Sequence, residues 1–172
     1  MKYEIDEEII VVPYQKIWPR LFRVEKNKIK KIFRDKAVQI EHFGSTSIFG
    51  MSAKPVVDIL VGVKQLSAIR RELIALKREG YEYLGEAGVP GRLALRKRGK
   101  ESYNLAVVLW SGEVWKNNLV IRDYLRVHPI ERKKYSEHKE KVMKMNGTLL
   151  AYSRAKQKFM ADLLQKAKEW KG

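Results

Sequence analysis

The sequence contains no cysteine and only three histidines among its 172 residues. The lack of cysteine excludes a disulfide scaffold, a cysteine nucleophile and thiolate metal sites. A zinc site built from several histidines is also not expected. No run of about 18 apolar residues occurs, so the sequence predicts no membrane-spanning helix. The five prolines do not cluster, and no linker or internal repeat divides the chain.

The remaining composition is that of a folded domain. Hydrophobic residues make up 45% of the chain and aromatic residues 10%, which is enough for a buried core. The length suits a single domain, expected over residues 1–172. The N-terminus MKYEIDEEII is acidic and lacks the basic-then-apolar pattern of a secretory signal, so we expect a cytoplasmic protein.

The charge is strongly positive and unevenly distributed. The net charge is +16, with nine cations against two anions in residues 13–36 and fifteen against six in residues 114–172. A basic surface concentrates anions, and nucleic acid, nucleotides or phosphorylated metabolites would all satisfy it. The alternative is a solvated lysine-rich surface that keeps the protein dissolved. Charge alone favours this second interpretation.

The apolar pattern predicts an α+β fold. Helices are expected over residues 18–33, 66–79, 113–126, 129–145 and 149–169, with Gly147 as a break before the last. Strands are expected over 37–43, 56–63, 81–84, 92–98 and 103–110, the last two as a hairpin, and residues 8–12 as a strand or extended arm. This order indicates a mixed sheet flanked by helices in a core of about 15–112, with a C-terminal helical extension over about 113–172.

One buried strand contains an unexpected carboxylate. Residues 56–63 read VVDILVGV, which is typical of a strand buried on both faces, and Asp58 lies within it. A carboxylate in such a place is costly unless it is hydrogen-bonded, paired or bound to a cation. The turn that precedes this strand begins with Gly44 and Ser45. Asp58 is therefore a candidate site residue, with a buried aspartate that merely braces the turn as the alternative.

This arrangement resembles the nucleotidyltransferase signature, in which a Gly-Ser turn precedes a strand that bears carboxylates. In that reading Gly44 lets the backbone approach a triphosphate, and Ser45 and Thr46 donate to its oxygens. Asp58 would hold Mg²⁺, with Glu41 as a second ligand. Asp58 and Ser45 are then the candidate catalytic residues. A tight turn with an N-cap is the structural alternative for Gly44 and Ser45.

More narrowly, the sequence resembles the GrpB-like family, which has the nucleotidyltransferase fold. The resemblance rests on blocks that follow one another along the chain: VVPYQKIW, EHFGSTSIFGMSAKPVVDI, GYEYLGEAGVPGR, RDYLRVHP and Tyr152 with AKQKF. Three departures from the expected pattern stand out. Leu60 occupies the place of a second strand carboxylate, and Phe49 stands where proline is usual. Histidines are common on the strand that reads YNLAVV here, and Tyr103, Asn104 and Ala106 replace them.

Other charged residues are candidates for the same site. Lys54, Arg92 and Arg122 are expected to contact phosphate. The alternatives are a pair with a surface carboxylate for Lys54, a solvated hairpin charge for Arg92, and an internal salt bridge or surface contact for Arg122. The weaker candidates are His42, Glu86 and Lys156. His42 and Glu41 alternate along their strand, so only one of them is expected to face the Gly-Ser turn.

The sequence therefore leads to two hypotheses. The first is Mg²⁺-dependent transfer of a nucleotidyl group from a nucleoside triphosphate to an unknown acceptor, either RNA or a phosphorylated compound. The second is a non-catalytic nucleotide- or RNA-binding module on the same fold, which the missing carboxylate at Leu60 favours. Neither the nucleotide, the acceptor nor the oligomeric state follows from the sequence.

Overall fold

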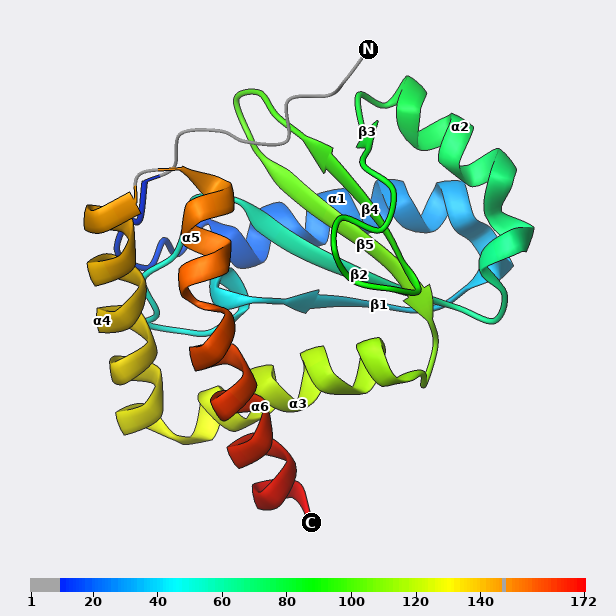
Figure 1. Ribbon diagram of the computed structural model, residues 1–172. Helices are drawn as coiled ribbons and strands as arrows, with labels where there is room; N and C mark the ends of the chain where they lie inside the picture. Colours follow the sequence, from blue (N-terminus) through cyan, green and yellow to red (C-terminus); the bar gives the residue numbers. More distant parts are fainter. Residues whose placement is uncertain (1–9, 147) are drawn as a thin grey trace.

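The computed structural model describes residues 10–146 and 148–172 and has a mixed five-stranded sheet at its centre (Figure 1). The order across the sheet is β1-β2-β5-β4-β3. The strands are β1 (Ala37–Phe43), β2 (Val57–Val63), β3 (Glu82–Tyr83), β4 (Arg92–Lys97) and β5 (Tyr103–Leu109). β2 and β5 are parallel, and the other neighbours are antiparallel. The expected α+β fold with a mixed sheet is thus confirmed.

Helices cover both faces of this sheet. They are α1 (Trp18–Phe33), α2 (Arg70–Arg78), α3 (Glu113–Val127), α4 (Pro129–Asn146), α5 (Leu149–Ala155) and α6 (Gln157–Lys171). α1 and α2 lie on one face and α3 on the other, whereas α4 and α5 lie beside the end of the sheet and α6 crosses α3 (Figure 1). The C-terminal helical extension therefore meets the rest of the molecule through α3 on the sheet and through the segment between β1 and β2.

The apolar run of β2 is explained by burial on both faces. On one face Ile59 and Val61 join a core cluster with residues of α1, such as Ile29. On the opposite face Leu60 packs with Trp115 of α3. A third cluster joins α3, α4 and α6 to the segment between β1 and β2, and its buried members are Ile48, Met51, Val120, Tyr124, Leu125, Tyr135, Leu163 and Ala167.

The boundaries differ from the expected ones in a few places. The last predicted helix is interrupted at Lys156, between α5 and α6, without a glycine or proline to mark the break. The helix expected from residue 66 begins with a 3₁₀ turn over Leu66–Ile69 before α2. In the predicted N-terminal arm, Val12 pairs with Ala53 in an isolated bridge, whereas residues 8 and 9 and the predicted break at Gly147 lie outside the described residues. Within the described ranges no helix is long and apolar enough to cross a membrane.

Gly62 permits the close packing of two tryptophans on the sheet. A Cβ at this position would lie 2.9 Å from Trp110 Cδ1 and 2.9 Å from Trp115 Cζ3. Real Cβ atoms essentially never make such contacts, so a side chain here would push α3 away from β2.

We therefore expect Gly62→Ala to lower the free energy of unfolding by about 1–3 kcal/mol, the usual cost of overpacking a core. Urea denaturation measures this change. Gly99→Ala is the matched control, because its Cβ would meet nothing closer than 4.0 Å and should change stability by less than about 0.5 kcal/mol. Equal stability of the two variants would contradict the tight packing at Gly62.

Candidate functional site

The candidate site begins where Asp58 meets the turn after β1. Asp58 lies opposite Phe43 of β1 and beside Asn104 of β5. Gly44 has a φ of 66°, a conformation that glycine adopts without strain. A Cβ at Gly44 would also collide with Asp58 Oδ2. The pattern of glycine before Ser45 therefore has a steric cause, since only glycine lets the turn lie against the carboxylate.

The other oxygen of Asp58 is held by β5. Asn104 Nδ2 donates to Asp58 Oδ1 at 2.9 Å, and Arg98 donates to Asn104 Oδ1 at 3.0 Å. These two bonds fix which way the Asn104 amide faces. Asp58 is thus a half-buried carboxylate that a neutral donor orients.

The turn itself, Ser45–Ser47, is braced from the α1 side of the sheet by His42. His42 Nε2 lies 2.9 Å from Thr46 Oγ1, and the imidazole stacks on Phe22 at 4.7 Å. The pKa of His42 is lowered to about 4. Burial is the main cause, and the positive charges of Arg126 and Arg122 contribute in the same direction. His42 is consequently a neutral, hydrogen-bonded residue on the face away from Asp58, which agrees with the structural alternative for this residue.

Lys139 of α4 reaches the same turn from the other side. Its side chain is 1% exposed, and Nζ lies 2.8 Å from Ser45 Oγ. Nζ also donates to the Ser52 carbonyl and lies over the Tyr135 ring, 4.5 Å from its centroid. Burial lowers the pKa of Lys139 well below its usual value, and the nearby ammonium of Lys156 acts in the same direction. α4 is thereby fixed to the segment that connects β1 and β2.

Two further lysines flank a buried tyrosine beside this turn. Lys54 Nζ lies 5.9 Å, and Lys156 Nζ 5.2 Å, from the centroid of the Tyr152 ring. Lys156 also donates to the Tyr135 hydroxyl at 3.3 Å. Burial raises the pKa of Tyr152, and the charge of Asp58 contributes to this increase. Lys54, Lys156 and Tyr152 therefore belong to the surroundings of Asp58.

Arg92 supplies a cation from the first position of β4. Its guanidinium donates to the carbonyls of Glu86 and Ala87, which holds the loop in place. Burial lowers the pKa of Arg92, and the Asp58 carboxylate opposes that change. Glu86 Oε1 accepts from the Gly91 N–H at 2.8 Å, so this carboxylate takes part in the loop's own folding.

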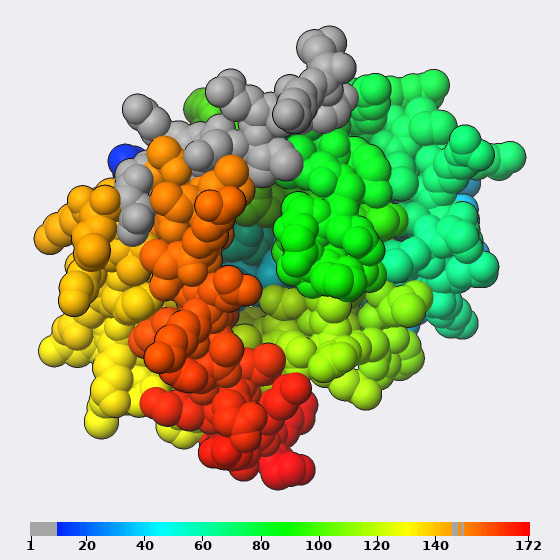
Figure 2. All heavy atoms as spheres, in the orientation of Figure 1, coloured from blue at the N-terminus to red at the C-terminus, as the bar shows by residue number. Residues whose placement is uncertain are grey.

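The surface is hollowed between these groups. Figure 2 shows a depression between the orange α5 region and the green loop before β4, with atoms of the teal and blue-cyan part of the chain at its floor. We use the name Asp58 cleft for the region around Asp58 that the contacts and charges above define by Ser45, Lys54, Asp58, Arg92 and Lys156. The structure therefore brings together five of the residues that the sequence singled out.

Two predicted site residues bind each other instead. Glu41 lies opposite Leu60, which is two residues after Asp58 on β2. Arg122 donates to Glu41 Oε2 at 2.6 Å. Arg122 also donates to the carbonyl of His42 and to the carboxylate of Asp123. This ion pair fastens α3 to β1. The metal-binding role expected for Glu41 and the phosphate contact expected for Arg122 stay predictions.

Lys139 was not expected to be a site residue, although the pattern of α4 indicates that it is unusual. Tyr135, Lys139 and Val142 are spaced by four and three residues and are all buried, so they form one stripe on α4. A lysine on an apolar stripe is as unusual as an aspartate in an apolar strand. Asn104 was noted only as a departure from a family pattern, and its bond to Asp58 depends on the parallel pairing of β2 and β5.

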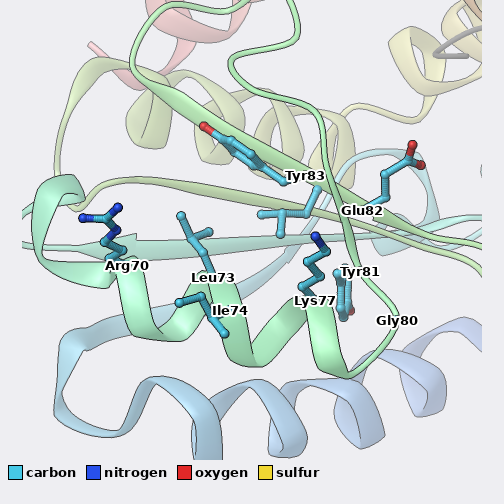
Figure 3. A pocket seen from close by; sticks show the side chains of 9 residues that line it. Arg70, Leu73, Ile74, Lys77, Gly80, Tyr81, Glu82 and Tyr83 are labelled. Carbon is cyan, nitrogen blue, oxygen red and sulfur yellow. The ribbon is translucent and has the colours of Figure 1, made fainter. Parts of the chain in front are cut away.

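Two other hollows lie away from this cleft. One, of about 670 Å³, lies between α2 and the sheet edge, and Figure 3 shows Leu73, Ile74 and Lys77 of α2 facing Tyr83 across it. The second, of about 570 Å³, lies between α3 and the end of α6. Neither includes Asp58 or the Gly44 turn, and we do not place the site there.

The shifted pKa of His42 gives a prediction for stability. The ordinary histidine pKa is about 6.5. Below that pH, His42 becomes protonated in the unfolded chain, whereas in the folded chain it stays neutral down to about pH 4. Stability from this group is therefore present above pH 6.5 and lost as the pH falls toward 4. Between pH 7 and pH 4.5, we expect the free energy of unfolding to fall by about 2–3 kcal/mol less in His42→Gln than in the wild type. Urea denaturation at both pH values measures the difference, and equal losses would contradict a buried neutral His42.

Comparison with known proteins identifies the family. A family model described as GrpB protein matches residues 8–166. Glutamate-rich protein GrpB of Alkalihalophilus pseudofirmus is 32% identical over 91% of this chain and 94% of its own length. YqkA of Bacillus subtilis is 30% identical over 95% of this chain, and dephospho-CoA kinase of Mycobacterium tuberculosis is 27% identical over 93%. The chain spans only about half the length of these last two, 48% and 46% respectively.

Solved structures agree with this assignment. The crystal structure of GrpB from Enterococcus faecalis superposes with a TM-score of 0.85 at 30% identity, covering 94% of this chain and 99% of that one. Cid1, solved in complex with the UTP analogue UMPNPP, superposes with a TM-score of 0.50 at 18% identity, covering 84% of this chain and 48% of that one, and shows a shared fold. The chain belongs to the GrpB family.

Proposed function

We propose that this chain binds the polyphosphate part of a nucleotide in the Asp58 cleft. The observation that carries the proposal is the charge of the cleft, where Lys54, Lys156 and Arg92 surround the Asp58 carboxylate. Each of these cations is half-buried, so water screens it less than a fully exposed charge. A polyanion is the ligand whose charge such a site complements.

Mutual repulsion among the lysines supports this interpretation. Burial is the largest cause of the lowered pKa of Lys139, and the ammonium of Lys156 acts in the same direction. The carboxylates of Asp58 and Glu140 oppose the change, and Lys54 adds to the lowering. A phosphate bound beside Lys54 and Lys156 would offset the repulsion between their positive charges. The electrostatic repulsion among these cations is therefore unfavourable in the unliganded site, and an anionic ligand would offset it.

The relatives give independent but coarser support. Cid1 was solved in complex with a UTP analogue, and its fold is shared by this chain. The nucleotide itself stays unassigned, and RNA or a phosphorylated acceptor stays a prediction from the charge of the surface.

The donor set near Asp58 does not fit two magnesium ions. Two-cation chemistry needs carboxylates that flank or bridge the ions. Position 60 is leucine, Glu41 is bound by Arg122, and among the described ranges no group of three acidic, histidine or cysteine side chains is suited to a metal. We therefore propose binding, with phosphate charge neutralised by lysine and arginine, ahead of metal-dependent nucleotidyl transfer.

The first prediction concerns the lysines of the cleft. Lys54→Met and Lys156→Met should each weaken binding of inorganic tripolyphosphate about tenfold, because each removes a charge-assisted contact worth about 1.4 kcal/mol. Isothermal titration calorimetry at low salt measures the affinity, with ATP as a second ligand. Lys133→Met is the matched control, since this side chain is 79% exposed on α4 and pairs with Glu137. Equal affinity in all three variants would contradict the proposed site.

The second prediction separates direct binding from binding through a metal. In a cleft that neutralises phosphate with its own cations, Asp58→Asn removes a repulsive charge and should strengthen tripolyphosphate binding in EDTA. If Mg²⁺ carried the binding, the same variant would lose an affinity that the wild type shows only with Mg²⁺. Titrations of both proteins with EDTA and with Mg²⁺ decide between the two. The variant keeps the shape of the side chain, and circular dichroism checks that it folds.

A further inference from the structure

Ser45 and Lys139 form a hydroxyl–amine pair at the floor of the Asp58 cleft. Ser45 is half-buried and lines the cleft, whereas Lys139 lies beneath it and is 1% exposed. Nζ and Oγ are 2.8 Å apart, which is within the range for direct proton transfer. Because Lys139 is buried, its direct polar partner on the cleft side is Ser45 rather than solvent.

The surroundings of Lys139 suit a neutral amine. Lys139 Nζ contacts Ser45 Oγ and the Ser52 carbonyl. A neutral lysine has two N–H donors and one lone pair, so it would still donate to the Ser52 carbonyl and would accept the Ser45 O–H. An isolated ammonium in this position would be costly because burial removes its water. The lowered pKa of Lys139 has the same cause and agrees with the contacts.

The other two hydroxyls of the turn are arranged differently. Ser47 Oγ donates to the Gly44 carbonyl at 2.6 Å, which occupies its proton. Thr46 Oγ1 lies beside His42 but is 1% exposed, so a ligand in the cleft cannot reach it. Within the turn, Ser45 alone is both open to the cleft and in contact with a basic side chain.

We propose that Ser45 is a nucleophile, with Lys139 as its general base, and that it accepts a phosphoryl group from a polyphosphate bound in the cleft. The substrate class rests on the proposed function. Ser45 Oγ forms a bond to the terminal phosphorus, the bond from that phosphorus to the bridging oxygen breaks, and the shortened phosphate leaves as an anion. The serine proton passes to Lys139 Nζ. Lys54, Lys156 and Arg92 are placed to stabilise the phosphoryl oxygens.

The reactivity of the serine is tested first with a fluorophosphonate probe, which needs no nucleotide. Oγ attacks phosphorus, fluoride leaves, and peptide mass spectrometry locates the adduct. We expect adduct at Ser45 in the wild type and in Ser47→Ala, and none at this position in Ser45→Ala. Lys139→Met should react about 100-fold more slowly, the usual contribution of a general base.

A structural role for Lys139 is separated by rescue. In Lys139→Ala, added alkylamines should restore labelling, with faster rates for more basic amines, whereas a mere loss of packing would not respond to amine basicity. Lys139→Arg tests the same point, because arginine keeps the charge but does not act as a base near neutral pH. Unfolding curves identify any variant that fails to fold. If a Lys139 variant does not fold, the pH dependence of Ser45 labelling is measured in the wild type and in Ser47→Ala instead.

The phosphoryl donor is tested with inorganic tripolyphosphate in EDTA. We expect phosphoserine at position 45 in the wild type, detected by peptide mass spectrometry, and its loss in Ser45→Ala and Lys139→Met. Calorimetry on the same samples reports binding separately. Binding without phosphoserine overturns this inference and leaves the proposed function intact, whereas absence of binding overturns both. Labelling that is independent of Lys139 also overturns it.

Discussion

The packing of the Gly44 backbone against the Asp58 carboxylate determines where the remaining parts of the cleft lie. It requires a residue without a side chain at position 44, and it brings the turn over the start of β2. The turn then meets Lys139 from α4 on one side and His42 from β1 on the other. A larger residue at this point would separate the hydroxyls of the turn from the sheet.

The ionisable side chains around the cleft also reduce the stability of the fold. Burying an amine such as Lys139 costs free energy, and only part of that cost is offset by Ser45 Oγ, the Ser52 carbonyl and the ring of Tyr135. A methionine of similar length would fill the same space without that cost. Arrangements of this kind concentrate at functional sites, because perturbed ionisable groups there are matched to a ligand or a reaction.

The sequence predicted the elements and part of the site, for reasons that particular residues show. Asp58 was predictable because its carboxylate interrupts a β-branched run, and Gly44 because a Gly-Ser turn precedes it. An internal salt bridge was the stated alternative for Arg122, but its partner was not predictable. Glu41 lies 81 positions away in the chain, and the pair depends on how α3 packs on β1. The break at Lys156 has no local marker, since packing rather than glycine or proline produces it.

The cleft lies along the seam between two separately packed parts of the molecule. The cluster that includes α4 and α6 shares no buried member with the cluster that includes α1 and β2, and it meets the β1–β2 connection through Ile48 and Met51. Lys156 stands on one side of this seam and Arg92 on the other. A ligand that contacts both parts would favour the closed arrangement, so cleft occupancy and the free energy of local opening of the helical part are thermodynamically linked. Amide hydrogen exchange in α4 and α6 would then report whether the cleft is occupied.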